Sequence, residues 1–193
     1  MAPQVVRLPG RMTRVASLLA LAALTVLVLT GCSRHHESPE PEGQAVKVHD
    51  LSYTVFITRQ LNLRDPEDRD YFSGPEAPPG FADFGVFIQV CNDFNHAPQR
   101  VPVNSFKIID TRGREYAPTP LPKSDIFAYR PEKLGAKQCV PIAGSAPATG
   151  PIGGSLLLFK LPIKSIENRP LDLEIDPPAG GETPESQKIE LDI

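Results

Sequence analysis

The side chains that usually hold transition metals are scarce in this 193-residue chain, which has 2 Met, 3 Cys and 4 His. Both methionines, Met1 and Met12, lie close to the N-terminus, and no histidine follows Cys139. A blue-copper centre needs a histidine after its cysteine and usually an axial methionine. His49 and His96 each lack a second histidine two or four positions away, so we expect them on the surface. These shortages argue against a copper site or another histidine-based metal site.

Sequence signatures of common enzymes are also missing. The chain has no G-x-S-x-G nucleophile elbow, no glycine-rich phosphate loop and no C-x-x-C redox pair. It carries 20 Lys and Arg against 23 Asp and Glu, whereas proteins that bind nucleic acid or anionic lipid by charge need clustered basic residues. We therefore expect no enzymatic activity, no catalytic residues, no cofactor and no nucleic-acid partner.

The N-terminus, in contrast, has a clear pattern. Arg7, Arg11 and Arg14 make a basic start, and residues 15–30 carry no charge. A basic region followed by a short apolar region is typical of a secretory signal, and this apolar stretch is shorter than the ~20 residues needed to span a bilayer. We expect residues 1–31 to be a signal peptide that is removed on export, with an uncleaved membrane helix as the alternative.

The apolar stretch ends in Leu29-Thr30-Gly31-Cys32. This tetrapeptide resembles the lipobox of bacterial lipoproteins. The resemblance implies cleavage before Cys32, a diacylglyceryl thioether on its thiol, and further acylation of the new amino terminus by a chain such as palmitate. Two or more acyl chains anchor stably, because each buried CH2 contributes roughly 0.8 kcal/mol. The predicted location is the extracytoplasmic face of a cell membrane, with an ordinary signal peptide and a chance cysteine as the alternative.

The remaining chain is expected to form one domain behind a flexible linker. Removing the signal leaves 17 basic and 23 acidic residues, a net charge of −6. Residues 32–45 hold the lipidated cysteine and a polar, proline-rich stretch without a large apolar side chain, which predicts disorder. His35 and His36 in that stretch are interpreted as solvated linker residues. The domain is assigned to residues 46–193, which is enough chain for a core.

Short strands separated by proline-rich loops are the expected architecture. Of the 22 prolines, 20 follow the signal, and proline is excluded from helix interiors and central strands. Alternation or short apolar runs predict strands at 46–58, 85–92, 101–110, 114–116, 155–161, 171–175 and 189–193, with shorter ones near 125–129 and 137–142. Long irregular segments are predicted at 59–82 and 117–150. The predicted fold is all-β, a single antiparallel immunoglobulin-like β-sandwich of about seven to nine strands.

Alternation also assigns faces to these strands. The side chains expected to face the core are Leu51, Tyr53, Val55, Ile57, Val86, Ile88, Val90, Phe106 and Ile108. Phe87, Gln89 and Cys91 are left on the opposite face of their strand. In 171–175 and 189–193 acidic residues alternate with apolar ones and predict a charged outer face.

Four pieces of the chain occur in an order that carries a family resemblance. They are Val90-Cys91-Asn92, the hairpin Phe106…Asp110…Gly113…Tyr116, the run Gly154–Phe159 and the alternating Leu171–Ile175. Together they resemble the telokin-like, immunoglobulin-type domains found on many Gram-positive lipoproteins, over about residues 46–176. The resemblance implies a β-sandwich outside the membrane and no catalytic residues. The 59–82 segment and the two domain cysteines depart from the family pattern.

Cys91 and Cys139 are an even pair in an exported domain, which favours a disulfide. The bond would close a loop of about 48 residues and contribute about 3–4 kcal/mol by the chain-entropy estimate. Because Cys91 is assigned to the face opposite the core, we expect the bond to tie the 130–142 segment across the outer face or edge of the sheet. If the face assignment is reversed, the bond runs through the core instead.

Two groups of loop residues are weak candidates for binding. Alternate carboxylates can bind calcium, although the neighbouring arginines and the missing central glycine argue against it; these residues are Asp65, Glu67, Asp68 and Asp70. Aromatic side chains and arginine on loops are typical of protein-binding hot spots; these are Tyr71, Phe72, Phe81, Phe127, Tyr129 and Arg130. The alternative for the aromatic group is that it covers the open end of the sandwich.

The leading functional hypothesis is a membrane-anchored, non-enzymatic binding or accessory module at the cell envelope. It would contact an envelope protein through loops 59–82 and 117–135, and the lipid would raise its local concentration near membrane partners. The alternative is a lipoprotein that binds calcium or a small ligand. A purely structural subunit of a membrane complex has the same sequence features.

Overall fold

The computed structural model describes residues 38–96, 99–177 and 185–192, and residues from Ser38 onward form one compact unit. The predicted signal peptide, Cys32, His35 and His36 lie outside the described residues, so their assignments stay predictions. Among the described residues, no helix is long and apolar enough to cross a membrane.

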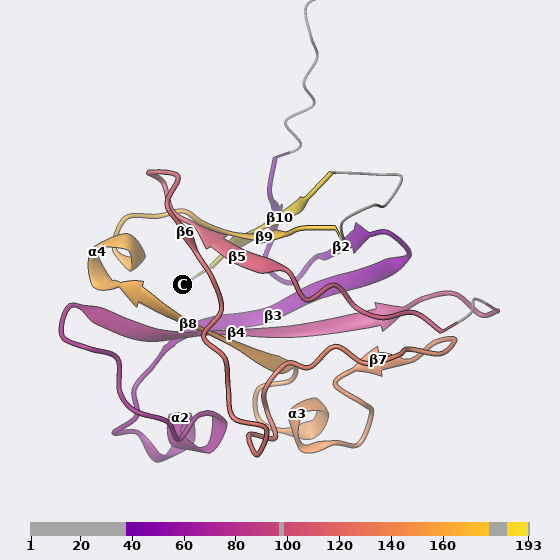
Figure 1. Ribbon diagram of the computed structural model, residues 1–193, viewed down its shortest axis with the longest axis horizontal. Helices are drawn as coiled ribbons and strands as arrows, with labels where there is room; N and C mark the ends of the chain where they lie inside the picture. The colour runs from indigo at the N-terminus through magenta and orange to yellow at the C-terminus, as the bar shows by residue number, and fades with distance from the viewer. Residues whose placement is uncertain (1–37, 97–98, 178–184, 193) are drawn as a thin grey trace, which may run out of the picture. The chain divides into compact units, whose positions relative to one another are not determined.

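Two sheets make up most of this unit (Figure 1). Sheet A has the order β1 (Glu40–Pro41), β10 (Gln187–Leu191), β9 (Leu171–Ile175), β5 (Phe106–Ile109) and β6 (Glu115–Tyr116). Sheet B has β2 (Ala45–Val48), β3 (Leu51–Leu61) and β4 (Phe81–Asn92), with β7 (Cys139–Val140) and β8 (Ser155–Pro162) both paired to β4. All pairs are antiparallel except β1 with β10. The fold is therefore mostly β, with two sheets compatible with a β-sandwich.

The main core lies between the two sheets and follows the predicted alternation. Val86, Ile88 and Val90 of β4 are buried there, and so are Phe106 and Ile108 of β5. The same core takes alternate residues of β8 and β9; these are Leu157, Phe159, Leu161, Leu171, Leu173 and Ile175. The predicted faces of β4, β5 and β9 are confirmed.

The turn that joins β5 to β6 also forms as predicted. Gly113 has φ = 72°, a conformation that costs glycine little, and its N–H donates to the carbonyl of Asp110 at 2.8 Å. The hairpin brings Tyr116 beside Asp110, and the tyrosine hydroxyl donates to Asp110 Oδ2 at 3.1 Å.

One face assignment is wrong because β3 contains a bulge. The register shifts between Val55 and Ile57, so the residues beyond the bulge point to the opposite faces from those that simple alternation gives. Ile57 is 39% exposed and Thr58 is buried in its place. The Thr58 hydroxyl donates to the carbonyl of Asp192 at 2.6 Å, so the buried polar group is satisfied.

The predicted linker extends too far at its C-terminal end. Glu40 and Pro41 pair with Ile189 and Glu190 of β10, which places them inside sheet A. Glu40 and Pro41 can join a sheet because backbone groups, not side chains, make the hydrogen bonds between strands. The folded unit therefore begins before Val46.

The segment 59–82 is less irregular than predicted. β3 continues to Leu61, β4 begins at Phe81, and α2 (Pro66–Tyr71) lies between them. Asp65 caps the helix by accepting a hydrogen bond from the Glu67 N–H at 3.0 Å, and Pro66 occupies the first turn, where its missing N–H costs little. Two further short helices are α3 (Ala146–Thr149) and α4 (Ile163–Ile166).

The charged outer face of sheet A is formed in part. Glu174 lies between two lysines, with Oε1 at 3.0 Å from Lys107 Nζ and Oε2 at 3.1 Å from Lys188 Nζ, and is only 8% exposed. The two lysines lower the pKa of Glu174 against the opposing effect of burial. This ion-pair network, rather than a solvated row of acids, covers the middle of the sheet.

Candidate binding groove

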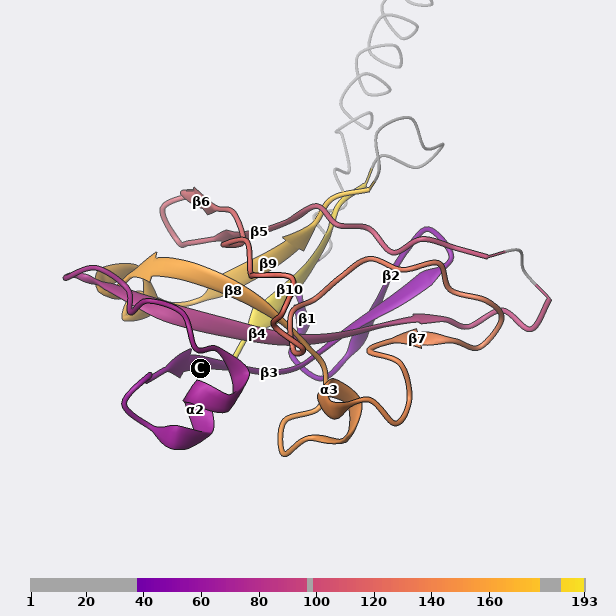
Figure 2. The same ribbon diagram turned by 60° about the horizontal axis from the view of Figure 1, so that its bottom comes forward.

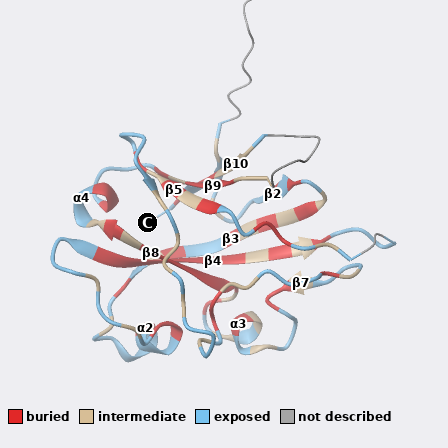
Figure 3. Cartoon of the chain, viewed as in Figure 1, coloured by how far each residue is buried: buried red, intermediate tan, exposed pale blue. Residues whose placement is uncertain are grey.

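A second core covers the outer face of sheet B. Phe87 of β4 and Leu156 and Leu158 of β8 point to this face and are fully buried. The side chains that cover them include Tyr71 of α2 and Phe127 of the loop after β6. The Tyr71 ring makes edge contacts with Phe87 at 5.1 Å and with Phe127 at 5.0 Å between ring centroids. In Figures 1 and 2, α2 and α3 lie on the side of sheet B away from sheet A. Burial on both faces of β4 explains why its sequence is almost continuously apolar (Figure 3).

The helix α2 is fixed to sheet B by an ion pair between a half-buried arginine and a buried carboxylate. Arg59 of β3 lies 2.7 Å from Asp68 Oδ1, and Asp68 Oδ2 accepts the Asn62 N–H at 2.7 Å. The Tyr71 hydroxyl accepts the Ile152 N–H at 3.1 Å, which joins α2 to the loop before β8. Gly85 leaves room for this layer, because a Cβ there would lie 3.0 Å from Leu156 Cδ1.

Asp125 and Arg130 shape the loop that follows β6. Asp125 Oδ1 accepts the N–H groups of Phe127 and Ala128 at 3.0 and 3.2 Å. Burial raises the pKa of Asp125, although these hydrogen bonds and the charge of Arg130 oppose the shift. Arg130 donates to the carbonyls of Leu121 and Pro122, so the loop is held at both ends.

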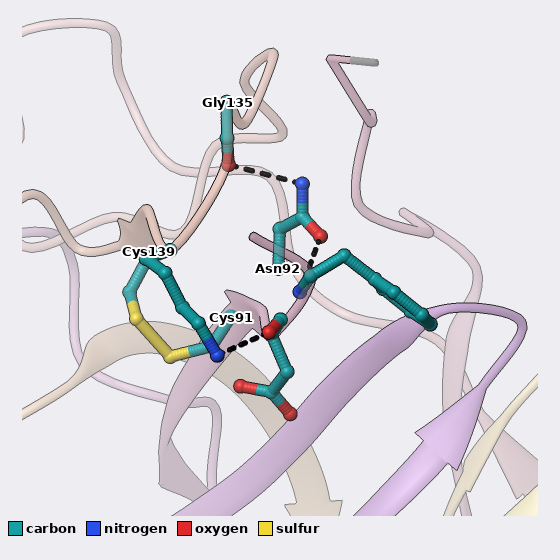
Figure 4. The surroundings of a disulfide bond; sticks show 7 residues. Cys91, Asn92, Gly135 and Cys139 are labelled. Atoms are coloured by element: carbon teal, nitrogen blue, oxygen red, sulfur yellow. Dashed lines mark hydrogen bonds between the residues drawn. A yellow bond between two sulfur atoms is a disulfide. The ribbon is translucent and has the colours of Figure 1, made fainter. Parts of the chain in front are cut away.

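The disulfide joins Cys91 of β4 to Cys139 of β7, which are direct partners in neighbouring strands of one sheet (Figure 4). This confirms the prediction of a bond at the edge or outer face rather than between the two sheets. Asn92, the next residue of β4, donates from its side chain to the Gly135 carbonyl at 3.0 Å. Together these two links attach the 132–140 segment to the end of β4.

Three hollows lie one after another along the surface of this outer layer. The first, of about 220 Å³, and the second, of about 180 Å³, share Asp125 and Ile126. The second and the third, of about 540 Å³, share Glu132, Pro141 and Ile142. Since each hollow shares lining residues with the next, we treat them as one feature and name it the loop groove.

The centre of the loop groove carries two exposed isoleucines. Ile126 is 66% exposed and Ile142 is 58% exposed, and both line the second hollow. The two ends differ in charge. Asp70 and Asp125 line the first hollow, whereas Lys133 and Lys137 line the third, together with Glu132. The groove thus has an acidic end, a mainly basic end, and a middle hollow where the two exposed isoleucines lie beside Asp125, Arg130 and Glu132.

The structure brings some of the predicted binding residues together, but mostly inside the protein. Tyr71, Phe72 and Phe127 belong to the second core, with 2, 5 and 9% exposure. This position matches the alternative expectation that the aromatics cover the sandwich. Their edges line the first hollow, and Arg130 lines the second.

Two other predicted binding residues lie apart from the groove. Tyr129 faces the main core, where it contacts the Phe106 ring at 5.2 Å and donates to the Val103 carbonyl at 2.9 Å. Phe81 is 44% exposed at the start of β4. Ile126 and Ile142 were not singled out from sequence, because each is one apolar residue in a proline-rich loop and no pattern marks it.

The predicted acidic cluster does not converge on a common point. Asp65 caps α2, and Glu67 and Asp68 both pair with Arg59, at 3.3 and 2.7 Å. Of the four, Asp70 alone lines the loop groove. Within residues 38–96, 99–177 and 185–192, no group of three or more His, Cys, Asp and Glu side chains could hold a metal ion.

No protein-family model matches the chain, and no curated protein matches it. Among solved structures, the chain is similar to the crystal structure of ycdA, a lipoprotein candidate from Bacillus subtilis, with a TM-score of 0.48 and 11% sequence identity. The aligned part covers 79% of this chain but 39% of ycdA, so this chain spans about two fifths of the length of that protein.

Proposed function

We propose that this chain is a lipid-anchored, non-enzymatic binding module that docks a partner protein of the cell envelope in the loop groove. The observation that carries the proposal is the pair of exposed isoleucines, Ile126 and Ile142, at the centre of one groove. Single exposed apolar residues are ordinary, whereas exposed apolar residues that gather in one hollow are typical of an interaction site. A partner that covers them removes apolar surface from water.

The groove walls support a role in binding because they are already fixed. The disulfide and Asn92 hold one side, while Asp125, Arg130 and the second core hold the other. A preformed surface loses little conformational entropy when a partner docks. Arg130 donates to carbonyls of its own loop, and Lys137 donates to the carbonyl of Asp93 beyond the end of β4, so both side chains help to hold the walls in place.

Two independent features support an extracytoplasmic location. The Leu29–Cys32 tetrapeptide resembles a lipobox, and the Cys91–Cys139 disulfide is of a kind that persists in oxidising compartments. The order of three motifs on two mainly antiparallel sheets supports a telokin-like, immunoglobulin-type sandwich. The motifs are Val90–Asn92, Phe106–Tyr116 and Leu171–Ile175.

The anchor is tested by metabolic labelling with an alkyne-bearing fatty acid. The natural protein should carry the label in the membrane fraction, and Cys32→Ala should lose both the label and membrane retention. A labelled Cys32→Ala protein would rule out lipid attachment at this residue.

The docking surface is tested by cross-linking in the native membranes, followed by affinity capture and mass spectrometry. Three proteins are compared: the natural chain, the double variant Ile126→Ser/Ile142→Ser, and the control Ile163→Ser. Ile163 is 40% exposed in α4 and lines none of the three hollows. We expect one partner that is lost only in the double variant. A partner retained by all three proteins would contradict docking in the groove.

A further inference from the structure

Charge is unevenly distributed around the loop groove. The residues that line its three hollows include three basic side chains, Arg130, Lys133 and Lys137, and three acidic ones, Asp70, Asp125 and Glu132. Because complementary potentials steer and orient association, the position of these charges along the groove matters more than their sum.

The charges at the two ends of the groove have opposite signs. Asp70 and Asp125 are the only charged residues that line the first hollow. Lys133 and Lys137 outnumber Glu132 in the third hollow. A ligand that spans the groove therefore contacts acidic side chains at one end and mainly basic side chains at the other.

The form of the groove favours a chain segment over a compact molecule. Its space is divided among hollows of about 220, 180 and 540 Å³, rather than gathered in one enclosed cavity. Hollows that adjoin along a surface suit successive side chains of an extended segment. Ile126 and Ile142 at the middle hollow would contact an apolar side chain.

We infer that the loop groove binds an extended segment of the partner protein in which a large apolar residue lies between a basic and an acidic residue. The basic residue lies at Asp70 and Asp125, the apolar one between Ile126 and Ile142, and the acidic one at Lys133 and Lys137. This inference rests on the proposed function and adds the chemistry of the partner.

A random dodecapeptide display library tests the recognition directly. It is selected on the full-length protein purified from its own membranes, with Ile126→Ser/Ile142→Ser for counter-selection. We expect enriched peptides with an apolar residue between opposite charges, and unchanged affinity for Ile163→Ser. Absence of enrichment, or enriched peptides without flanking opposite charges, would overturn the inference.

Charge reversal identifies the basic end. Lys133 is exposed, so Lys133→Glu should leave the fold intact. It should weaken the best peptide about three- to fivefold, and replacing the acid of the peptide by lysine should restore the loss. If Lys133→Glu has no effect, or if the changed peptide does not recover its affinity, the assignment of the basic end is wrong.

A membrane partner lost in the double variant, without any enriched linear peptide, would leave the proposed function in place and refute the extended segment alone.

Discussion

At the scale of single residues, Asp110 shows how one carboxylate organises a hairpin. It is 5% exposed, and its Oδ1 accepts the N–H groups of Arg112 and Arg114 at 2.9 and 3.0 Å. Oδ2 accepts from Arg114 Nε at 2.8 Å and from the Tyr116 hydroxyl. Burial alone would raise the pKa of Asp110, but the hydrogen bonds from Arg114, Arg112 and Tyr116 outweigh it and lower the pKa.

We therefore expect Asp110→Asn to lower the free energy of unfolding by about 2 kcal/mol at pH 7, because bonds to a charged acceptor are lost. Since folding lowers the pKa of Asp110, its stabilisation is complete above the unfolded-state pKa and declines as the pH falls below that value. Urea denaturation at pH 7 and pH 3 should show the difference between variant and natural protein shrinking in acid. A difference independent of pH would contradict this account.

Folding shifts the pKa of Asp172 in the opposite direction to that of Asp110. Burial raises its pKa, and Glu190 and Glu174 add to the shift against the charge of Lys188. Asp172 lies directly opposite Glu190 in the β9–β10 ladder, and its Oδ1 has no hydrogen-bond partner. Like charges facing each other across strands are destabilising, so Asp172→Asn should raise the free energy of unfolding by about 0.5 kcal/mol at pH 7.

The gain should vanish below the unfolded-state pKa of Asp172, because a raised folded-state pKa means that protonation removes the penalty. The same denaturation experiment at pH 7 and pH 3 measures it. A loss of stability at pH 7 would show that attraction to the charge of Lys188 outweighs burial and the repulsion from Glu190 and Glu174.

At the scale of elements, the disulfide holds a segment that has little regular structure. β7 is only two residues long, and the chain between β6 and β8 is otherwise loop and one short helix. The separation of 48 residues between Cys91 and Cys139 predicts that Cys91→Ala/Cys139→Ala lowers the free energy of unfolding by about 3–4 kcal/mol. Reductant should destabilise the natural protein by a similar amount and leave the variant unchanged. A reductant effect on the variant would point to a cause other than this bond.

Elements with a local pattern could be predicted from the sequence. β4, β5, β8 and β9 have alternating or continuous apolar residues, and burial follows directly from that period. β1 could not be predicted, because Glu40 and Pro41 join the sheet only through the backbone of Ile189 and Glu190, far away in sequence. Nor could the bulge, since Phe56 and Ile57 continue an apolar run.

The candidate site, like the fold, could be predicted from the sequence only in part. The predicted loops 59–82 and 117–135 line only part of the groove, which residues between 137 and 149 also line. The aromatic residues on the predicted loops do meet, but they meet as a second core over sheet B. A sequence shows that Tyr71 and Phe127 are aromatic and lie in loops; it does not show that Phe87 offers them a buried face. Only the folded structure shows that Ile126 and Ile142 line the same hollow.

At the scale of the whole molecule, the position of the domain boundary can be tested through Glu42. Its Oε1 accepts the Thr58 N–H at 3.1 Å, and its Oε2 lies 2.7 Å from the Thr58 hydroxyl oxygen and accepts the Asp192 N–H at 3.1 Å. Glu42 thus joins β3 to the end of β10, although the composition of residues 32–45 predicted a free linker.

Two shortened proteins separate these interpretations. A chain that begins at Ser38 should unfold cooperatively, whereas one that begins at Ala45 loses β1 and Glu42 and leaves the buried Thr58 N–H without its partner. An orphaned buried donor costs about 1–3 kcal/mol, and lost pairing with β10 adds to it, so we expect a deficit of about 2–4 kcal/mol in urea denaturation. Glu42→Gln in the longer chain should cost about 1–2 kcal/mol, since the amide oxygen keeps part of the bonding. Equal stability of the two shortened proteins would instead place residues 38–44 in the linker and move the start of the domain back toward Val46.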